Sequence, residues 1–381
     1  MPAVECRGGR GRDWRVGWTA RATGWAQAAT GWAQAATGWA QAATGWARAA
    51  SGWARAASGG SARGRPGGAA AAVGAGVVAL VLMLAASPAF AAPPGGHRGG
   101  GGGGGGGTPT APTGNDISYP QCGTTFPPSD AFGIVGLTGG LANNLNPCFG
   151  PSSKYPSYTQ TELYWAVTVP SGVTAQPRAS LYVNTADPGN MYDGTPIADW
   201  PTSGSSPYGT CTTTTVTARH RSYTVGADSQ ACAWVYGFDK ATQDVSWLAS
   251  AATAIDGQLG ASTVSGSPSG YPWWLDVETG NTWQSGSSGL AMNVADLQGM
   301  ADALGTSAAS TEVGIYSTTS QWLQITGGTS STTADLGGLP DWIPGATTLS
   351  GAEANCALAS FTGGTVEITQ FSGNPDNDYS C

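Results

Sequence analysis

The sequence predicts an α/β fold, a (β/α)8-type (TIM-like) barrel that is incomplete in its last units and stapled by disulfides. Short apolar segments alternate with stretches of helical periodicity, which is the order expected of a parallel sheet flanked by helices. The number of repeats favours a closed barrel over an open sheet. An even number of cysteines in the same region indicates that disulfide bonds reinforce it.

Seven segments are predicted to be strands, because each is short, apolar and separated from the next by polar stretches. They are Asn115–Gln121, Phe132–Leu137, Ala179–Asn184, Trp273–Glu278, Val313–Ser317, Asp341–Pro344 and Val366–Phe371. Helices are predicted between them at Thr159–Val169, Ser229–Leu259, Met292–Leu304 and Thr318–Ile325. In such a barrel, functional residues gather where strands end and the following loops begin.

The chain before this domain has a different composition. Residues 1–62 form a low-complexity leader whose heptads carry one Trp and one Gly each, too few apolar residues for a coiled coil, so it is predicted to be disordered or to precede the natural start. Residues 63–91 combine positive charge, an apolar run and an Ala-x-Ala site, as a secretory signal peptide does. Residues 92–114 are predicted to be a flexible Gly/Pro-rich linker, and residues 115–381 the barrel domain.

The net charge and the predicted export limit the classes of molecule that the domain is expected to bind. From residue 92 onward, six Lys and Arg stand against 21 Asp and Glu, a net charge of −15. Such a surface repels nucleic acids and anionic membranes. The apolar run of the signal is rich in Ala and Gly, so no stable membrane insertion is expected. A secreted, extracellular monomer is predicted.

Six cysteines of the exported part are predicted to form three disulfides. They are Cys122, Cys148, Cys211, Cys232, Cys356 and Cys381. Fifteen pairings are open to six cysteines. Sequential pairing is predicted, because each neighbouring pair brackets one excursion of the chain.

The most informative stretch is Tyr271-Pro-Trp-Trp-Leu-Asp-Val-Glu-Thr279. Side chains two apart on a strand point to the same side, so Asp276 and Glu278 are expected to project together from its end. Two converging carboxyl groups beside aromatic residues are the basic equipment for hydrolysing a glycosidic bond. One must donate a proton while the other stays ionised, and their mutual repulsion helps to separate their pKa values.

The domain resembles the glycoside hydrolase family 25 lysozymes and related glycoside-hydrolase-like barrels of secreted actinobacterial proteins. The matching segments are Asp116-Ile-Ser-Tyr-Pro-Gln121, Asp276-Val-Glu278, Gly314-Ile-Tyr-Ser317 with Trp322, Trp342-Ile343 and Gln370-Phe-Ser372. The terminal Asp of that family falls on Asp378, with Asp376 as the alternative. The resemblance covers most of residues 115–381.

The resemblance implies roles for four acidic residues. Glu278 is the expected proton donor, and Asp276 is expected to orient the substrate or stabilise positive charge. Asp116 and Asp378 complete a floor of four carboxyl groups. The implied substrate is the glycan of bacterial peptidoglycan.

Five further residues are candidates for binding the sugar by stacking or hydrogen bonding. They are Tyr182, Asn184, Trp283, Tyr316 and Gln370. One segment departs from the family, because Gly136-Leu-Thr-Gly-Gly140 stands where a Lys-x-Thr-Glu-Gly type sequence is usual. The alternative therefore stays open that the same barrel is a non-catalytic module that binds a cell-wall polysaccharide. A third possibility is a purely structural exported domain.

Other chemistries find little support in the residues. From residue 92 onward the histidines are His97, in the linker, and His220, which argues against a His-rich zinc site and a Ser-His-Asp triad. No phosphate-loop or dinucleotide fingerprint follows a predicted strand. Neither a cofactor nor a metal is expected.

Overall fold

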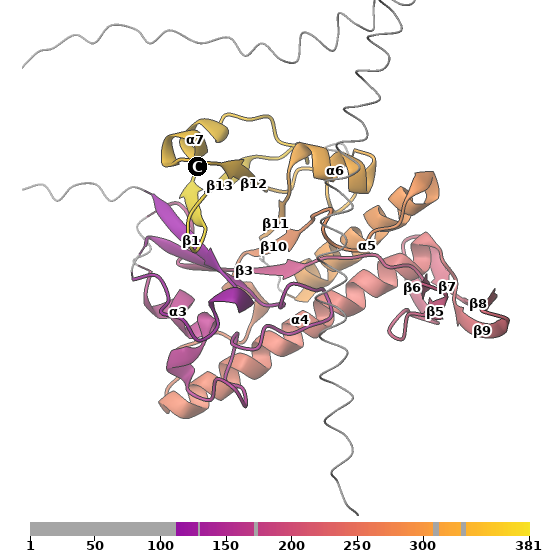
Figure 1. Ribbon diagram of the computed structural model, residues 1–381, viewed down its shortest axis with the longest axis horizontal. Helices are drawn as coiled ribbons and strands as arrows, with labels where there is room; N and C mark the ends of the chain where they lie inside the picture. Colours follow the sequence, from indigo (N-terminus) through magenta and orange to yellow (C-terminus); the bar gives the residue numbers. More distant parts are fainter. Residues whose placement is uncertain (1–111, 129, 171–173, 308–311, 329–332) are drawn as a thin grey trace, which may run out of the picture. The chain divides into compact units, whose positions relative to one another are not determined.

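The computed structural model describes residues 112–128, 130–170, 174–307, 312–328 and 333–381 (Figure 1). The predicted leader and signal peptide, and all but the last three residues of the predicted linker, lie outside the described residues. The first strand begins at Thr113, two residues before the predicted start of the domain.

Eight strands in the described part of the chain close into a barrel, in the order β1-β14-β13-β12-β11-β10-β3-β2. Their bounds are β1 Thr113–Ile117, β2 Phe132–Gly136, β3 Ala179–Asn184, β10 Trp273–Asp276, β11 Val313–Tyr316, β12 Asp341–Ala346, β13 Val366–Phe371 and β14 Asn377–Ser380. Neighbouring strands from β1 to β13 are parallel, whereas β14 runs antiparallel to both β13 and β1. The closed, mostly parallel α/β barrel agrees with the prediction, but its last strand departs from a (β/α)8 repeat.

Five α-helices and three short 3-10 helices are found among the described residues. They are η1 Tyr119–Gln121, η2 Tyr158–Gln160, α3 Glu162–Thr168, α4 Gln230–Leu259, η3 Pro268–Gly270, α5 Gly286–Ser307, α6 Thr319–Thr326 and α7 Leu349–Asn355. The longest, α4, begins after Ser229, whose side chain accepts a hydrogen bond from the Cys232 amide, and ends at Gly260 with φ 67°. These are ordinary start and stop signals for a helix. Helix α7 was not predicted.

Three two-stranded antiparallel hairpins lie between β3 and α4. Their strands are β4 Met191–Tyr192, β5 Thr195–Pro196, β6 Gly204–Ser206, β7 Gly209–Cys211, β8 Thr213–Ala218 and β9 Arg221–Gly226. Figure 1 places β5 to β9 beyond one end of α4, away from the barrel strands. The sequence did not predict these hairpins, because their Thr, Ser and Gly residues lack the apolar alternation of a half-buried strand.

The inside of the barrel is filled with large side chains rather than left as a pore. The buried members of this inner cluster are Ala131, Phe132, Ile134, Trp274, Trp342 and Ile368. Glycines on neighbouring strands make room for the rings: a Cβ added at Gly314 would lie 2.2 Å from the ring of Trp274. At Gly114 it would lie 2.5 Å from the ring of Phe132. The aromatic plug therefore supports whatever lies above it at the barrel mouth.

The outer faces of the strands pack against the helices in a separate and larger core. Strand residues such as Val135, Leu181 and Leu275 meet helix residues such as Leu248 and Leu297, and all five are fully buried. Burial of this apolar surface is the main force that holds the helices on the barrel. No helix in the described part of the chain has the length and apolar character needed to cross a membrane.

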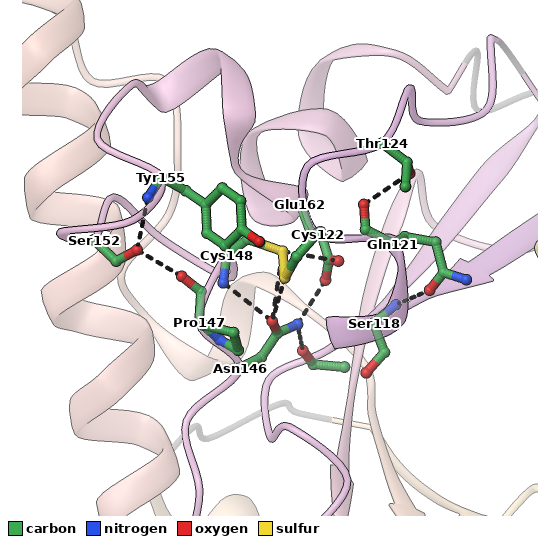
Figure 2. Close-up of a disulfide and its surroundings, with 11 residues drawn as sticks. Ser118, Gln121, Cys122, Thr124, Asn146, Pro147, Cys148, Ser152, Tyr155 and Glu162 are labelled. Atoms are coloured by element: carbon green, nitrogen blue, oxygen red, sulfur yellow. Dashed lines mark hydrogen bonds between the residues drawn. A yellow bond between two sulfur atoms is a disulfide. The ribbon is translucent and has the colours of Figure 1, made fainter. Parts of the chain in front are cut away.

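The six cysteines form the disulfides Cys122–Cys148, Cys211–Cys232 and Cys356–Cys381. This is the sequential pairing that was predicted. The first disulfide joins the segment that follows β1 to the segment that follows β2 (Figure 2). The third joins the end of α7 to the C-terminal residue.

Candidate active site

The register of the barrel brings polar and aromatic side chains to the same level at the ends of neighbouring strands. Asp276 on β10 is paired with Asn184 on β3 and with Tyr316 on β11. Tyr316 is in turn paired with Trp342 on β12. Because side chains in register on parallel neighbours point to the same face of the sheet, this layer faces the barrel mouth.

A cavity of about 130 Å³ lies at this mouth. Its lining residues are Asp116, Tyr182, Asp276, Glu278, Tyr316, Trp342, Gln370 and Asp376. Six of the nine predicted catalytic and sugar-binding residues thus line one cavity, although they are spread over more than 250 positions of the chain. Asp116 and Glu278 therefore lie at the same end of the barrel.

Asp276 is the most enclosed carboxyl group of the cavity wall, with 6% of its surface exposed. Its Oδ2 accepts a hydrogen bond from Asn184 Nδ2, and its Oδ1 has no partner. Burial and, next, the charge of Glu278 raise the pKa of Asp276 well above its ordinary value. Asn184 does not line the cavity but stands behind Asp276, where its Oδ1 accepts a 3.0 Å hydrogen bond from Thr138 Oγ1.

Glu278 is only partly buried and lies where the cavity meets solvent. Burial raises its pKa, while a hydrogen bond from Gln321 opposes the rise. Gln321 is held in place because its Oε1 accepts hydrogen bonds from Thr279 N at 2.6 Å and Thr279 Oγ1 at 3.1 Å. This orientation leaves the amide Nε2 to face Glu278. No local sequence pattern indicates this role for Gln321, because it depends on how α6 packs beside the end of β10.

The pair formed by Asp276 and Glu278 favours a single proton, since burial and the repulsion between two neighbouring negative charges both disfavour full ionisation. Deeper burial places that proton on Asp276. The roles implied by the resemblance need the opposite distribution, with Glu278 protonated and Asp276 ionised. Catalysis by Glu278 therefore requires that the proton pass from Asp276 to Glu278.

A second carboxyl pair, Asp116 and Asp378, lies on the other side of the mouth. Asp378 is fully buried, and its Oδ1 accepts a 2.9 Å hydrogen bond from Trp342 Nε1. Burial and the charge of Asp116 raise the pKa of Asp378 well above its ordinary value, so it keeps its proton and donates it in a hydrogen bond to Asp116. Asp378 thus supports Asp116 from behind, while Asp376 lines the cavity itself.

Asp116 is the member of this pair that ionises first. Burial, with a smaller effect of the Asp376 charge, raises its pKa to about 6, while a hydrogen bond from Gln370 opposes the rise. Gln370 Nε2 donates to Asp116 Oδ2 at 2.9 Å, and Gln370 Oε1 accepts from the Tyr316 hydroxyl at 3.0 Å. The two hydrogen bonds fix the orientation of the amide and hold Asp116 toward the cavity.

Two aromatic residues differ from expectation. Trp283 does not line the cavity; its indole Nε1 donates a 2.8 Å hydrogen bond to the carbonyl oxygen of Glu278 and so positions the segment after β10. Trp342 lines the cavity but was not predicted as a site residue. Its ring lies 4.5 Å from the ring of Tyr316, and the strand register that aligns the two was the signal that could have found it.

No protein-family model and no curated protein matches this chain. Among solved structures, it is similar to a muramidase from Trichobolus zukalii, with 16% sequence identity and a TM-score of 0.32. The alignment covers 71% of this chain and 94% of the muramidase.

Proposed function

We propose that this protein is a secreted glycoside hydrolase of the lysozyme-like kind, which cleaves the glycan of bacterial peptidoglycan by carboxylate acid–base catalysis. The observation that supports the proposal is the convergence of Asp116, Asp276 and Glu278 in one cavity at the barrel mouth. Paired carboxyl groups in a pocket with aromatic walls are what glycoside hydrolysis requires.

The proposed roles follow from depth in the cavity. Glu278, nearest to solvent, is the proton donor to the leaving oxygen. Asp276, deeper and with one carboxyl oxygen unpartnered, stabilises the positive charge that develops on the sugar. Asp116 binds the sugar from the opposite wall, and Asp378 holds Asp116 in place. Tyr182 and Tyr316, packed over the buried Trp342, supply surfaces for the sugar ring, and Gln370 positions Asp116.

Substrate must move the proton from Asp276 to Glu278 before the bond breaks. A sugar that gains positive charge beside Asp276 stabilises the ionised form of this carboxyl group. The proton then resides on Glu278, beside the leaving oxygen. The enclosed position of Asp276 makes this effect strong, because charges interact more strongly where water is excluded.

Export is part of the same proposal. Three disulfides suit an oxidising compartment outside the cytoplasm. The predicted signal peptide at 63–91 and linker at 92–114 would place the barrel outside the cell, where we expect it to be a monomer. The acidic surface fits a glycan substrate better than a nucleic acid or an anionic membrane, and acid–base catalysis by carboxyl groups needs no cofactor.

The test is the release of reducing ends from purified peptidoglycan by the wild type and by Glu278→Gln. Loss of the general acid is expected to lower the rate at least about a hundredfold. Glu353→Gln, which changes an exposed glutamate of α7, is the matched control and should keep the full rate. Equal thermal midpoints of the three proteins would show that folding is unaffected.

Two outcomes would overturn the hydrolase proposal. Full activity of Glu278→Gln would show that another group donates the proton. A wild type that sediments with peptidoglycan but releases no reducing ends would identify the barrel as a polysaccharide-binding module. The uncharged segment Gly136–Gly140 after β2 is the feature that favours this second outcome.

A further inference from the structure

The Cys122–Cys148 disulfide lies directly against a buried acidic side chain, Glu162 in the first turn of α3 (Figure 2). Glu162 Oε1 is 3.2 Å from Cys148 Sγ. Among the described residues, this trio is the group of His, Cys, Asp and Glu side chains whose ligand atoms lie close enough to hold a metal ion. The two sulfurs are bonded to each other and offer no thiolate, so the closeness points to disulfide chemistry instead.

Asn146 determines which oxygen of Glu162 carries the proton. Asn146 Oδ1 accepts a 3.1 Å hydrogen bond from the Cys148 amide, which fixes the orientation of the side-chain amide. Asn146 Nδ2 donates to Gly136 O at 2.8 Å and to Glu162 Oε2 at 2.7 Å. Because Oε2 is the acceptor, the proton of the neutral acid belongs on Oε1, the oxygen that faces Cys148 Sγ (Figure 2).

The surroundings keep Glu162 neutral over a wide pH range. The side chain is fully buried, and burial raises its pKa to about 8 against the opposing hydrogen bond from Asn146. Among the described residues, Tyr182 on β3 has its pKa raised well above its ordinary value, mainly by burial and to a small extent by the charge of Glu162. Tyr155 lies beside the disulfide in the loop before α3 (Figure 2).

The two cysteine residues differ in exposure. Cys148 is fully buried, whereas Cys122 is partly exposed and is followed by the exposed Gly123. An incoming thiolate must attack one sulfur and expel the other, and the attack is easiest at the sulfur with access to solvent. Cys122 is therefore the sulfur to be attacked, and the buried Cys148 is the leaving group.

We propose that Cys122 is a site of reversible modification by low-molecular-weight thiols, with Glu162 as the acid that protonates the departing Cys148 sulfur. The thiolate forms a bond to Cys122 Sγ while the Cys122–Cys148 bond breaks. The electron pair of that bond goes to Cys148 Sγ, which takes the proton from Glu162 Oε1. The products are a mixed disulfide at Cys122, a neutral Cys148 thiol and an ionised Glu162, and the reverse reaction restores the disulfide.

The modified site adjoins the candidate active site but does not depend on its proposed activity. Cys122 follows η1, and its amide donates a 3.2 Å hydrogen bond to Tyr119 O. Ser118, at the start of the same helix, forms a hydrogen bond with the Tyr182 hydroxyl in the cavity wall. Opening the disulfide releases this segment from the loop after β2 and so loosens one side of the mouth.

The test is the rate at which reduced glutathione reacts with the folded protein, followed by mass spectrometry after alkylation of free thiols. Glutathione is expected on Cys122 and the alkylating label on Cys148. Divided by the thiolate concentration, the wild-type rate constant should be level below pH about 8 and should fall about tenfold per pH unit above it, as Glu162 loses its proton. Glu162→Gln should react at least about tenfold more slowly below pH 8, with no fall above it.

Glutamine is a close control because it still accepts the hydrogen bond from Asn146 and still presents a donor to the sulfur, yet it cannot transfer a proton. Cys356–Cys381, in the same molecule, should react at the same rate in both proteins. Parallel pH profiles for Cys122–Cys148 in the two proteins, or glutathione on Cys148, would overturn the proposal. If Glu162→Gln fails to fold, the pH profile of the wild-type rate constant at Cys122–Cys148 is the test. A profile that does not fall above pH 8 would also overturn the proposal.

Discussion

Replacing Glu162 by Gln should change how the stability of the protein depends on pH. The folded-state pKa of Glu162 is about 8 because of burial, against an ordinary value of 4.5. Between these values the folded protein holds a proton that the unfolded chain has released. Its contribution to stability is therefore fully present below pH 4.5 and is lost as pH rises to about 8.

The size of the effect follows from the two pKa values. Stability changes by about 1.36 kcal/mol per pH unit over the window in which the folded and unfolded states differ by one proton. Over the interval from 4.5 to about 8, the wild type should lose about 5 kcal/mol through Glu162, as an upper bound. Glutamine does not titrate. The free energy of unfolding of Glu162→Gln should therefore rise by this amount, relative to that of the wild type, between pH 4.5 and pH about 8.

Urea unfolding with the disulfides intact, at pH values from about 5 to about 9, measures this difference. Other buried carboxyl groups titrate as well: burial raises the pKa of both Asp116 and Asp187 to about 6. They are present in both proteins and cancel in the comparison. Glu353→Gln controls for the loss of a surface glutamate. If the difference in the free energy of unfolding between the wild type and Glu162→Gln stays constant with pH, Glu162 is not a buried acid that holds its proton. The basis of the proposed thiol chemistry at Cys122 is then also lost.

Two further predictions concern the barrel mouth and the aromatic plug below it. Gln321→Leu removes the hydrogen bond that opposes the raised pKa of Glu278. The carboxyl ¹³C signal of Glu278 should therefore titrate at higher pH in this variant. An unchanged titration would exclude Gln321 as a positioning residue. Gly314→Ala places a Cβ 2.2 Å from the buried Trp274 ring and should destabilise the fold by at least about 1–3 kcal/mol in urea unfolding. Gly280→Ala, where a Cβ meets nothing within 4 Å, is its matched control, and equal stability of the two variants would contradict the packing argument.

The sequence predicted the seven parallel strands from short, mostly apolar segments, although residues 119–121 of the first predicted strand form the 3-10 helix η1 instead. It also placed Asp276 and Glu278 on one side of a strand end, since that follows from the two-residue period of a strand. Strand β14 escaped prediction because Asn377-Asp-Tyr-Ser380 is short and polar and gains its place only by pairing with β13 and β1. The antiparallel closure of the barrel depends on these long-range pairings, which no local pattern records.

The sequence indicated which candidate residues lie together, but not which of them hold a proton. Asp378 is beside Asp116, as the resemblance implied, but its full burial, and therefore its role as a neutral hydrogen-bond donor, depends on the packing of Trp342. Gln321 was missed for the same reason. Residue types and strand parity indicate which groups meet, whereas the depth of each group decides which one holds a proton.

The raised pKa values at the mouth have a common origin in burial, which no neighbouring cation among the described residues offsets. The ion pairs found among the described residues are Arg219–Asp193 and Lys240–Asp199, and both lie outside the cavity lining. The cost of burying Asp276 and Asp378 is thus not offset by an adjacent positive charge, and these groups keep their protons instead. A site that must deliver a proton near neutral pH benefits from this arrangement, because an Arg or Lys beside the carboxyl pair would lower both pKa values and remove the proton that Glu278 needs.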